Sequence, residues 1–234
     1  MIELIAFDGD DTLWHNESIF SVTQSRFRKL LDGYVPGAAI DQRLLATEMR
    51  NLRFFGYGIK GFILSMIETS IEVTKGRVAA ADIQKLIDTG KWMLEHPVEL
   101  LDGVPEMLDS LASKRRLMII TKGDLFDQES KIARSGVTDF FNRIEIVSEK
   151  DESTYRRILA SQSVSPDHFL MVGNSMKSDI LPVLALGGYA VHIPYHLTWA
   201  HEVVDQSPEN EQRLVVLRSI ADLASVVASI DDGI

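Results

Sequence analysis

The chain has 234 residues, of which 45% are hydrophobic and 25% charged, the balance of a globular protein with one large domain or a core plus a smaller insert. It contains no cysteine, which excludes disulfides, zinc–thiolate sites and thiol nucleophiles. The net charge of -10 argues against a nucleic acid polymer or a membrane surface as partner. A small anionic substrate is still compatible with this charge, because the electrostatic field within a binding site, not the net charge of the protein, governs what binds there.

The N-terminal residues show neither the basic region nor the apolar run of a signal peptide. No segment approaches the ~20 apolar residues that cross a bilayer. We therefore expect a cytoplasmic protein without a membrane partner. The sequence does not distinguish a monomer from a homodimer.

The apolar run at 2–7 predicts the first strand. Residues 16–98 then read as helices alone, with Leu, Ile, Met and Phe at helical spacing. The helices predicted there cover 18–31, 40–55, 60–73 and 80–95. We expect this segment to form an all-helical domain inserted after the first strand.

From residue 99 onward, short apolar runs alternate with helical segments. Near-continuous apolarity suits strands that are buried on both faces of a parallel sheet. The predicted strands are 117–121, 143–147, 168–172, 189–193 and, before a closing helix, 213–217; the predicted helices are 103–115 (with Asp102 as N-cap), 124–135, 151–161 and 178–186. The expected fold class is α/β: a Rossmann-like parallel sheet in a three-layer α/β/α core over 1–15 and 99–234, with the helical domain over 16–98.

Chemically active side chains gather in the loops that follow these strands. Ligands of open parallel sheets bind beyond the carboxyl ends of the strands. There the sequence places DGDDT at 8–12, TKGD at 121–124, SEK at 148–150 and GNS at 173–175, with Asp179 a few residues on. A parallel sheet would bring these loops together.

The acids Asp8, Asp10 and Asp11 need an explanation, because crowded carboxylates resist ionisation unless a cation or a proton relieves them. A carboxylate can attack phosphorus to form an aspartyl phosphate if Mg²⁺ screens the two anions. A second acid can protonate the leaving oxygen and then activate water. A lysine and a Thr hydroxyl can hold the phosphoryl oxygens. The pattern favours metal-assisted phosphoryl transfer, with Asp11 as a turn or capping residue.

The sequence resembles the haloacid dehalogenase-like hydrolase superfamily, most of whose members are Mg²⁺-dependent phosphatases. Asp8, Asp10 and Thr12 match its DxDx(T/V) motif after an apolar strand, and Thr121 ends the strand of its second motif. Lys150 is the chosen lysine of the third motif, and GNSMKSD at 173–179 aligns with its GDxxxxD motif. The resemblance covers 1–14 and 99–195, and the helical insert lies where the family places its cap.

The resemblance implies a role for each matched residue. Asp8 would be the nucleophile and a metal ligand, and Asp10 the general acid/base, with its backbone carbonyl on the metal. Lys150 would neutralise the phosphoryl group and Asp179 would complete the Mg²⁺ site. The phosphate-binding set would be Asp8, Gly9, Thr121, Lys122, Gly123 and Lys150. The substrate would be a small phosphorylated metabolite.

One position departs from the family pattern. Asn174 stands where the first acid of the fourth motif is expected, so a neutral amide replaces an anion there. An amide oxygen can still bind Mg²⁺ or a metal-bound water. We expect weaker metal binding rather than lost catalysis.

Alternatives to a phosphatase remain at this stage. A sugar phosphomutase of the same superfamily would leave the phosphate on its product, and a non-catalytic binding protein would be expected to lack essential residues. Asp10 argues against the superfamily's metal-independent dehalogenases, which lack the second acid.

Several residues near the motifs have two interpretations. Lys122 could supply the phosphoryl-binding cation instead of Lys150, and Trp14 and His15 could either contact substrate or pack. The segment 50–62 is either a substrate loop or an inter-helix turn with solvated charges. The histidines at 192, 196 and 201 lack nearby acids in a metal frame, so we expect packing and surface roles for them.

Overall fold

The computed structural model describes residues 1–202, 204 and 212–233, and it divides into two compact units. The core unit comprises Met1–Glu17, Val98–Lys122 and Lys131–Ile234. The helical unit comprises Ser18–Pro97 and Gly123–Ser130.

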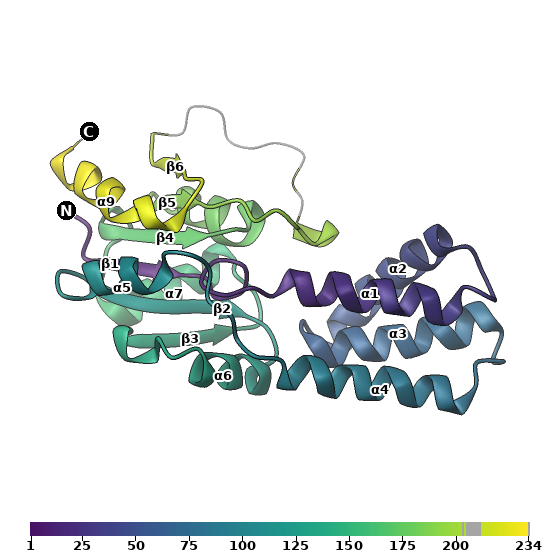
Figure 1. The fold of residues 1–234 in the computed structure, drawn as a ribbon. Coiled ribbons are helices and arrows are strands. Elements are labelled where there is room, and N and C mark those ends of the chain that lie inside the picture. Colours follow the sequence, from purple (N-terminus) through teal and green to yellow (C-terminus); the bar gives the residue numbers. More distant parts are fainter. Residues whose placement is uncertain (203, 205–211, 234) are drawn as a thin grey trace. The chain divides into compact units, whose positions relative to one another are not determined.

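The core unit contains a six-stranded sheet in the order β3-β2-β1-β4-β5-β6, and all its neighbouring strands pair in parallel (Figure 1). Its strands are β1 (Leu4–Phe7), β2 (Arg116–Lys122), β3 (Arg143–Val147), β4 (Phe169–Gly173), β5 (Tyr189–His192) and β6 (Leu214–Val216). The central strand β1 pairs with β2 on one side and β4 on the other, with Phe7 opposite Ile119 and Val172. The predicted parallel α/β fold is confirmed.

Both faces of the sheet are buried, which explains the continuous apolar strand sequences. Alternate residues of β1 enter two separate clusters: Ile5 and Phe7 on one face, Leu4 and Ala6 on the other. The first face is covered by α5 (Val104–Ala112), α9 (Leu223–Asp232) and Ile132 of α6 (Leu125–Arg134); the second is covered by α7 (Glu152–Gln162) and α8 (Leu181–Ala185). The core therefore has the three predicted α/β/α layers.

The helices α1–α5 lie between β1 and β2 in the chain, so the predicted insertion after the first strand is confirmed. Four of them, together with the segment 123–130, form the helical unit: α1 (Glu17–Leu31), α2 (Gly37–Phe55), α3 (Ile59–Thr74) and α4 (Ala80–Glu95). Their apolar faces meet in one cluster that includes Phe27, Leu44, Phe62 and Met93. The helical periodicity of residues 16–98 thus corresponds to a separate apolar interior.

Two helix starts differ from the prediction. Gly103, with a φ of 82°, precedes α5, and no side chain caps that helix, so the assignment of Asp102 as its N-cap is wrong. The helix predicted at 178–186 begins earlier, as a π-helical turn over Met176–Ile180 that continues into α8. Pro182 has no N–H to donate to the Ser178 carbonyl four residues back; the Tyr155 hydroxyl donates to it instead, at 3.1 Å.

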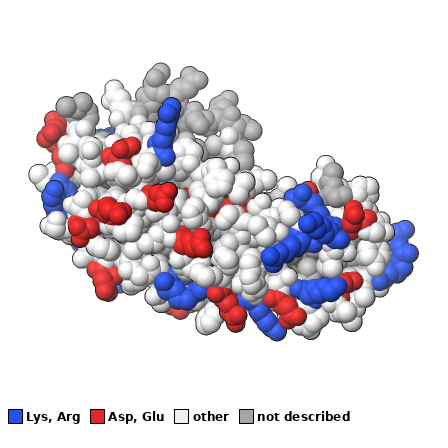
Figure 2. All heavy atoms as spheres, in the orientation of Figure 1, with Lys and Arg blue, Asp and Glu red and all other residues white. Residues whose placement is uncertain are grey.

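The surface agrees with the sequence composition. On the face drawn in Figure 2, both units carry charges of both signs, with basic side chains more prominent on the helical unit and acidic ones on the core unit. None of the helices in the described part of the chain has the length and apolar character that a bilayer crossing needs. The cytoplasmic location stays a prediction.

Asp11 lies in a turn after β1 and caps α1, the first helix of the insert. Its backbone is left-handed, with a φ of 61°. Its carboxylate accepts hydrogen bonds from the backbone N–H groups of Asn16 (2.9 Å) and Glu17 (3.0 Å). Burial, reinforced by repulsion from Asp10, raises the pKa of Asp11 to about 7. Asp11 is therefore a capping residue, as the sequence suggested.

Replacement of Asp11 tests this cap. Asp11→Ala removes the acceptor and places alanine in a left-handed conformation, so we expect the free energy of unfolding to fall by about 1–2 kcal/mol. Asp11→Asn keeps an acceptor, tolerates the left-handed backbone and removes a buried charge, so it should match wild type or slightly exceed it at pH 8. Urea unfolding followed by circular dichroism measures both; equal losses in the two variants would contradict the capping role.

Candidate active site

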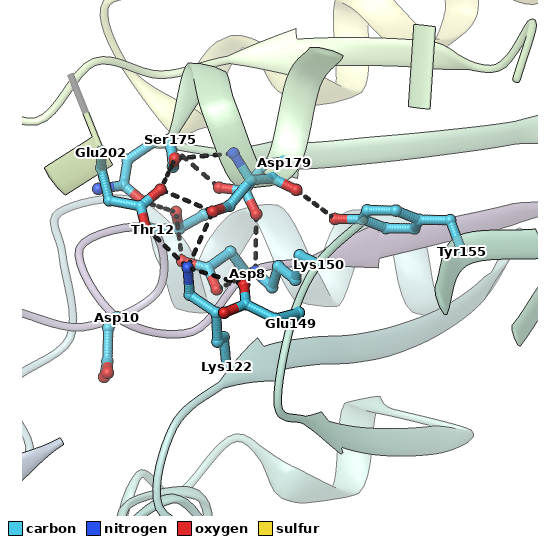
Figure 3. Close-up of polar contacts among 12 residues, drawn as sticks. Asp8, Asp10, Thr12, Lys122, Glu149, Lys150, Tyr155, Ser175, Asp179 and Glu202 are labelled. Carbon is cyan, nitrogen blue, oxygen red and sulfur yellow. Dashed lines mark hydrogen bonds and ion pairs between the residues drawn. The ribbon is translucent and has the colours of Figure 1, made fainter. Parts of the chain in front are cut away.

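Asp8 lies at the carboxyl end of β1, in the middle of the sheet. Its backbone N–H donates to the Val172 carbonyl of the neighbouring β4 at 2.9 Å, and its side chain is buried. The Lys150 ammonium donates to one carboxylate oxygen of Asp8 and, at 2.6 Å, to Oδ1 of Asp179 (Figure 3). Residues from three separate loops therefore meet around one lysine, as the sequence predicted.

The second oxygen of Asp179 is held by its own loop. Oδ2 accepts a hydrogen bond from the Ser175 backbone N–H at 3.0 Å. The approach is so close that a Cβ added at Gly173 would lie 2.2 Å from this oxygen. Glycine at the end of β4 is therefore required for Asp179 to reach the site.

Two factors set the pKa values around Lys150: all three side chains are buried, and one positive charge faces two carboxylates. Burial raises the pKa of Asp8 to about 7; Lys150 opposes this shift, and the neighbouring carboxylates of Asp179 and Asp10 add to it. Burial alone would lower the pKa of Lys150, but attraction from Asp179 and Asp8 outweighs it, so that pKa is raised. One ammonium is shared by two buried carboxylates, which leaves room for a further cation.

The oxygen donors nearby suit a hard cation. Besides the carboxylates of Asp8 and Asp179, the site has the Asn174 amide oxygen. The Thr12 hydroxyl lies 3.4 Å from this oxygen and 3.5 Å from Oδ2 of Asp8. No group of three or more His, Cys, Asp or Glu residues in the described part of the chain could hold a metal ion by itself. Few carboxylates, an amide oxygen and water make the kind of set that Mg²⁺ accepts, so the residues present fit this ion.

The carboxylate of Asp10 is not part of the Lys150 cluster and points away from it in Figure 3. It accepts hydrogen bonds from Nε1 of Trp14 at 2.7 Å and from Nζ of Lys131 at 2.8 Å. Trp14 is fully buried and packs in the core, which decides between its two interpretations. The contact of Lys131 with Asp10 was not predicted from the sequence. The only sequence signal is that this lysine precedes the apolar Ile132 in an amphipathic helix.

Thr121, Gly9 and Gly123, also predicted to bind phosphate, each lie in a different local environment. Thr121 is buried in β2, opposite Ile146. The peptide of Gly9 forms a tight turn, and a Cβ there would lie 2.6 Å from the Trp14 ring. Gly123 begins the 123–130 segment of the helical unit, and its phosphate-binding role stays a prediction.

Lys122 pairs with Glu202, an acid that lies outside the sequence motifs. Its ammonium donates to Oε1 of Glu202 at 2.7 Å and to Oγ of Ser178 at 3.0 Å. Burial alone would raise the pKa of Glu202, but the ion pair with Lys122 and hydrogen bonds from Ser175 and Ser178 lower it to about 2. Lys122 is thus committed to Glu202, and Lys150 is the lysine that contacts Asp8.

The helical unit has its own polar cluster in the segment predicted as a substrate loop or turn. Lys60 pairs with Asp124 at 2.8 Å, and Arg50 donates to Glu68 and Glu72 on α3. These pairs lie within the helical unit, and the choice between the two interpretations stays open.

Comparison with known proteins points to one family. The family model for haloacid dehalogenase-like hydrolases matches residues 2–187. A solved haloacid dehalogenase-like hydrolase from Xanthomonas campestris is 43% identical, with a TM-score of 0.89 over 99% of this chain and 93% of that one. A putative hydrolase from Bacillus subtilis, crystallised bound to magnesium, is 18% identical, with a TM-score of 0.64 over 97% and 98% of the two chains, and shows the fold alone.

Two curated relatives are phosphatases. Mouse N-acylneuraminate-9-phosphatase is 31% identical over 123 residues, which are 48% of each chain, so this chain spans about half the length of that relative. Glyceraldehyde 3-phosphate phosphatase from Methanothermobacter thermautotrophicus is 22% identical over 97% of this chain and 100% of its own.

Gly173→Ala tests the close approach of Asp179 to the end of β4. The added methyl group must displace the Asp179 carboxylate, so we expect the free energy of unfolding to fall by about 1–3 kcal/mol. The matched control is Gly33→Ala at an open position, which should change it by less than about 0.5 kcal/mol. Urea unfolding of the two variants makes the comparison, and equal small effects would contradict the steric argument.

The Glu202–Lys122 pair predicts a pH-dependent contribution to stability. The pKa of Glu202 is lowered from 4.5 to about 2, so its ionised form stabilises the protein fully above pH 4.5, and this contribution is lost as the pH falls toward 2. Glu202→Gln should reduce the free energy of unfolding by about 1–3 kcal/mol at pH 7. Urea unfolding at several pH values should show the difference shrinking below pH 4.5; a difference independent of pH would contradict it.

Proposed function

Because the chain belongs to the haloacid dehalogenase-like hydrolase family, we propose that it hydrolyses a small phosphomonoester through a phospho-Asp8 intermediate with Mg²⁺. The observation that carries this proposal is the buried Asp8 carboxylate, bonded to Lys150, which also binds Asp179. An anionic nucleophile approaches a phosphate only if positive charge screens both groups, and Lys150 together with a bound Mg²⁺ would supply that charge.

Each residue has a proposed chemical role. The Asp8 carboxylate attacks phosphorus and the ester oxygen leaves, protonated by Asp10; Asp10 then removes a proton from the water that cleaves the phospho-Asp8. Lys150 and the Thr121 hydroxyl, with backbone N–H groups of Gly9, Lys122 and Gly123, hold the phosphoryl oxygens. Asp10 must turn away from Lys131 to act, because its carboxylate now points away from Asp8.

The proposed Mg²⁺ ligands are the side chains of Asp8, Asp179 and Asn174 and the backbone carbonyl of Asp10. When bound, the ion would offset the negative charge that Asp8 and a phosphate share. Support for this choice comes from the oxygen donor set of the site and from the magnesium bound to the Bacillus subtilis protein.

The substrate is proposed as a class only. The two curated relatives are named for N-acylneuraminate 9-phosphate and glyceraldehyde 3-phosphate, which supports a small phosphorylated metabolite. We propose that residues 16–98 act as a cap that selects this substrate and excludes water, over a core of 1–15 and 99–234.

Phosphate release across a metabolite panel that includes both compounds tests the function, with Mg²⁺ and with EDTA. Asp8→Asn removes the nucleophile and should lower kcat by about 10³-fold or more. The matched control Asp11→Asn changes a neighbouring acid that only caps α1 and should retain activity. Activity of Asp8→Asn, or activity in EDTA, would contradict the mechanism, and a product that keeps its phosphate would indicate a phosphomutase.

Asn174→Asp tests the proposed metal site separately. An anionic oxygen attracts a divalent cation more strongly than an amide oxygen does, so Mg²⁺ should bind roughly 10-fold more tightly. Isothermal titration calorimetry measures the affinity, and Asn174→Ala should weaken it. An unchanged affinity in both variants would remove Asn174 from the metal site.

A further inference from the structure

We propose that Glu202 is a positioning residue for the metal-binding loop 174–179, which it ties to Lys122 at the end of β2. This inference rests on the proposed function, because the metal role of Asn174 and Asp179 is part of that proposal. It adds a residue from outside the four sequence motifs and beyond the range 2–187 that the family model matches.

Glu202 ends a segment that returns to the site after β5. This segment, residues 193–202, is called the strap here. It begins where the Ile193 N–H donates to the Gly173 carbonyl at 3.0 Å. Tyr195 is then joined to His15 by a hydrogen bond of 2.7 Å, and Lys177 donates to the His201 carbonyl at 3.0 Å. The strap is thus bonded to the rest of the core unit at several points along its length.

The carboxylate of Glu202 organises the serines of the metal-binding loop. Its Oε2 accepts from Oγ of Ser175 at 2.5 Å and from Oγ of Ser178 at 2.6 Å (Figure 3). The Ser175 backbone N–H in turn donates to Oδ2 of Asp179. Glu202 is therefore connected to the proposed metal ligand Asp179 through a single residue, Ser175.

The same loop closes on itself through these serines. The Ser178 N–H donates to Oγ of Ser175 at 3.0 Å, at the start of the π-helical turn. The Ser175 hydroxyl donates its proton to Glu202, so a lone pair of the same oxygen can accept the hydrogen bond from the Ser178 N–H. Loss of Glu202 would free both hydroxyls to rotate and would loosen the turn that carries Asp179.

Glu202 acts by position and not as a metal ligand. Its Oε1 is taken by Lys122 and its Oε2 by the two serines, and the side chains of Lys122 and Glu202 are only 12% and 13% exposed. The charges of the pair cancel, so Glu202 does not replace the anion that is missing at Asn174. It supplies order to a loop that has one acid fewer than the family pattern.

The test is the affinity of the folded, full-length protein for Mg²⁺, measured by isothermal titration calorimetry. Glu202→Gln keeps the shape but loses the charge and one acceptor oxygen, so we expect the dissociation constant to rise about 10-fold. Hydrolysis of the best panel substrate should show the same shift in the Mg²⁺ concentration at half-maximal rate, while kcat at saturating Mg²⁺ changes less than about threefold. Near-ultraviolet circular dichroism confirms folding at the temperature used.

Two further variants separate positioning from general loosening of the strap. Tyr195→Phe removes the hydrogen bond to His15, a strap contact separate from Glu202, and it should leave the affinity for Mg²⁺ within twofold of wild type. Ser175→Ala should weaken binding as Glu202→Gln does, and the double variant should lose no more than either alone, because both interrupt the same connection.

An affinity of Glu202→Gln within twofold of wild type would overturn the proposal. So would equal weakening by Tyr195→Phe, additive losses in the double variant, or no binding of Mg²⁺ by wild type. The proposed function fails on different grounds, namely hydrolysis that survives Asp8→Asn or the absence of any phosphomonoester substrate. Calorimetry of Mg²⁺ does not depend on either result.

Discussion

The structure depends on one buried ammonium placed between two carboxylates. Lys150 contacts Asp8 and Asp179, which lie far apart in the sequence, and all three side chains are buried, so water does little to stabilise their charges. Removing the lysine would leave two buried like charges, which is among the most costly changes a protein interior can suffer. The loops after β1, β3 and β4 are therefore fixed relative to one another by charge as well as by the sheet.

The sheet makes this meeting possible. Parallel pairing of β1 with β2 and β4 places the carboxyl ends of all three at the same edge, and the glycine at 173 lets Asp179 approach the backbone within contact distance. Most of this could be predicted from the sequence, because apolar runs define the strands and the unusual polar residues directly follow them. The π-helical start at Met176–Ile180 was not predicted, and the bond from Tyr155 that satisfies its Ser178 carbonyl comes from another helix and leaves no local sequence signal.

Lys131 and Glu202 show a second limit of sequence reasoning. Each pairs with a residue far away in the chain, Lys131 with Asp10 and Glu202 with Lys122, and neither belongs to a recognisable motif. Their spacing within helix and strap gives no sign of the partner. The tertiary structure shows that Lys150 contacts Asp8 and that Lys122 pairs with Glu202; which of the two lysines binds a phosphoryl group stays a prediction.

The hydrogen-bond partners of Asp8, Asp10 and Asp11 explain how three acids can lie close together after β1. Asp10 accepts hydrogen bonds from Lys131 and Trp14, and Asp11 accepts them from the N–H groups that open α1, so both have partners other than Lys150. Asp8 and Asp179 share one buried cation, and this local excess of negative charge would favour the binding of a divalent ion. The proposed metal site is thus distinguished less by the number of acids than by the single cation that two buried carboxylates share.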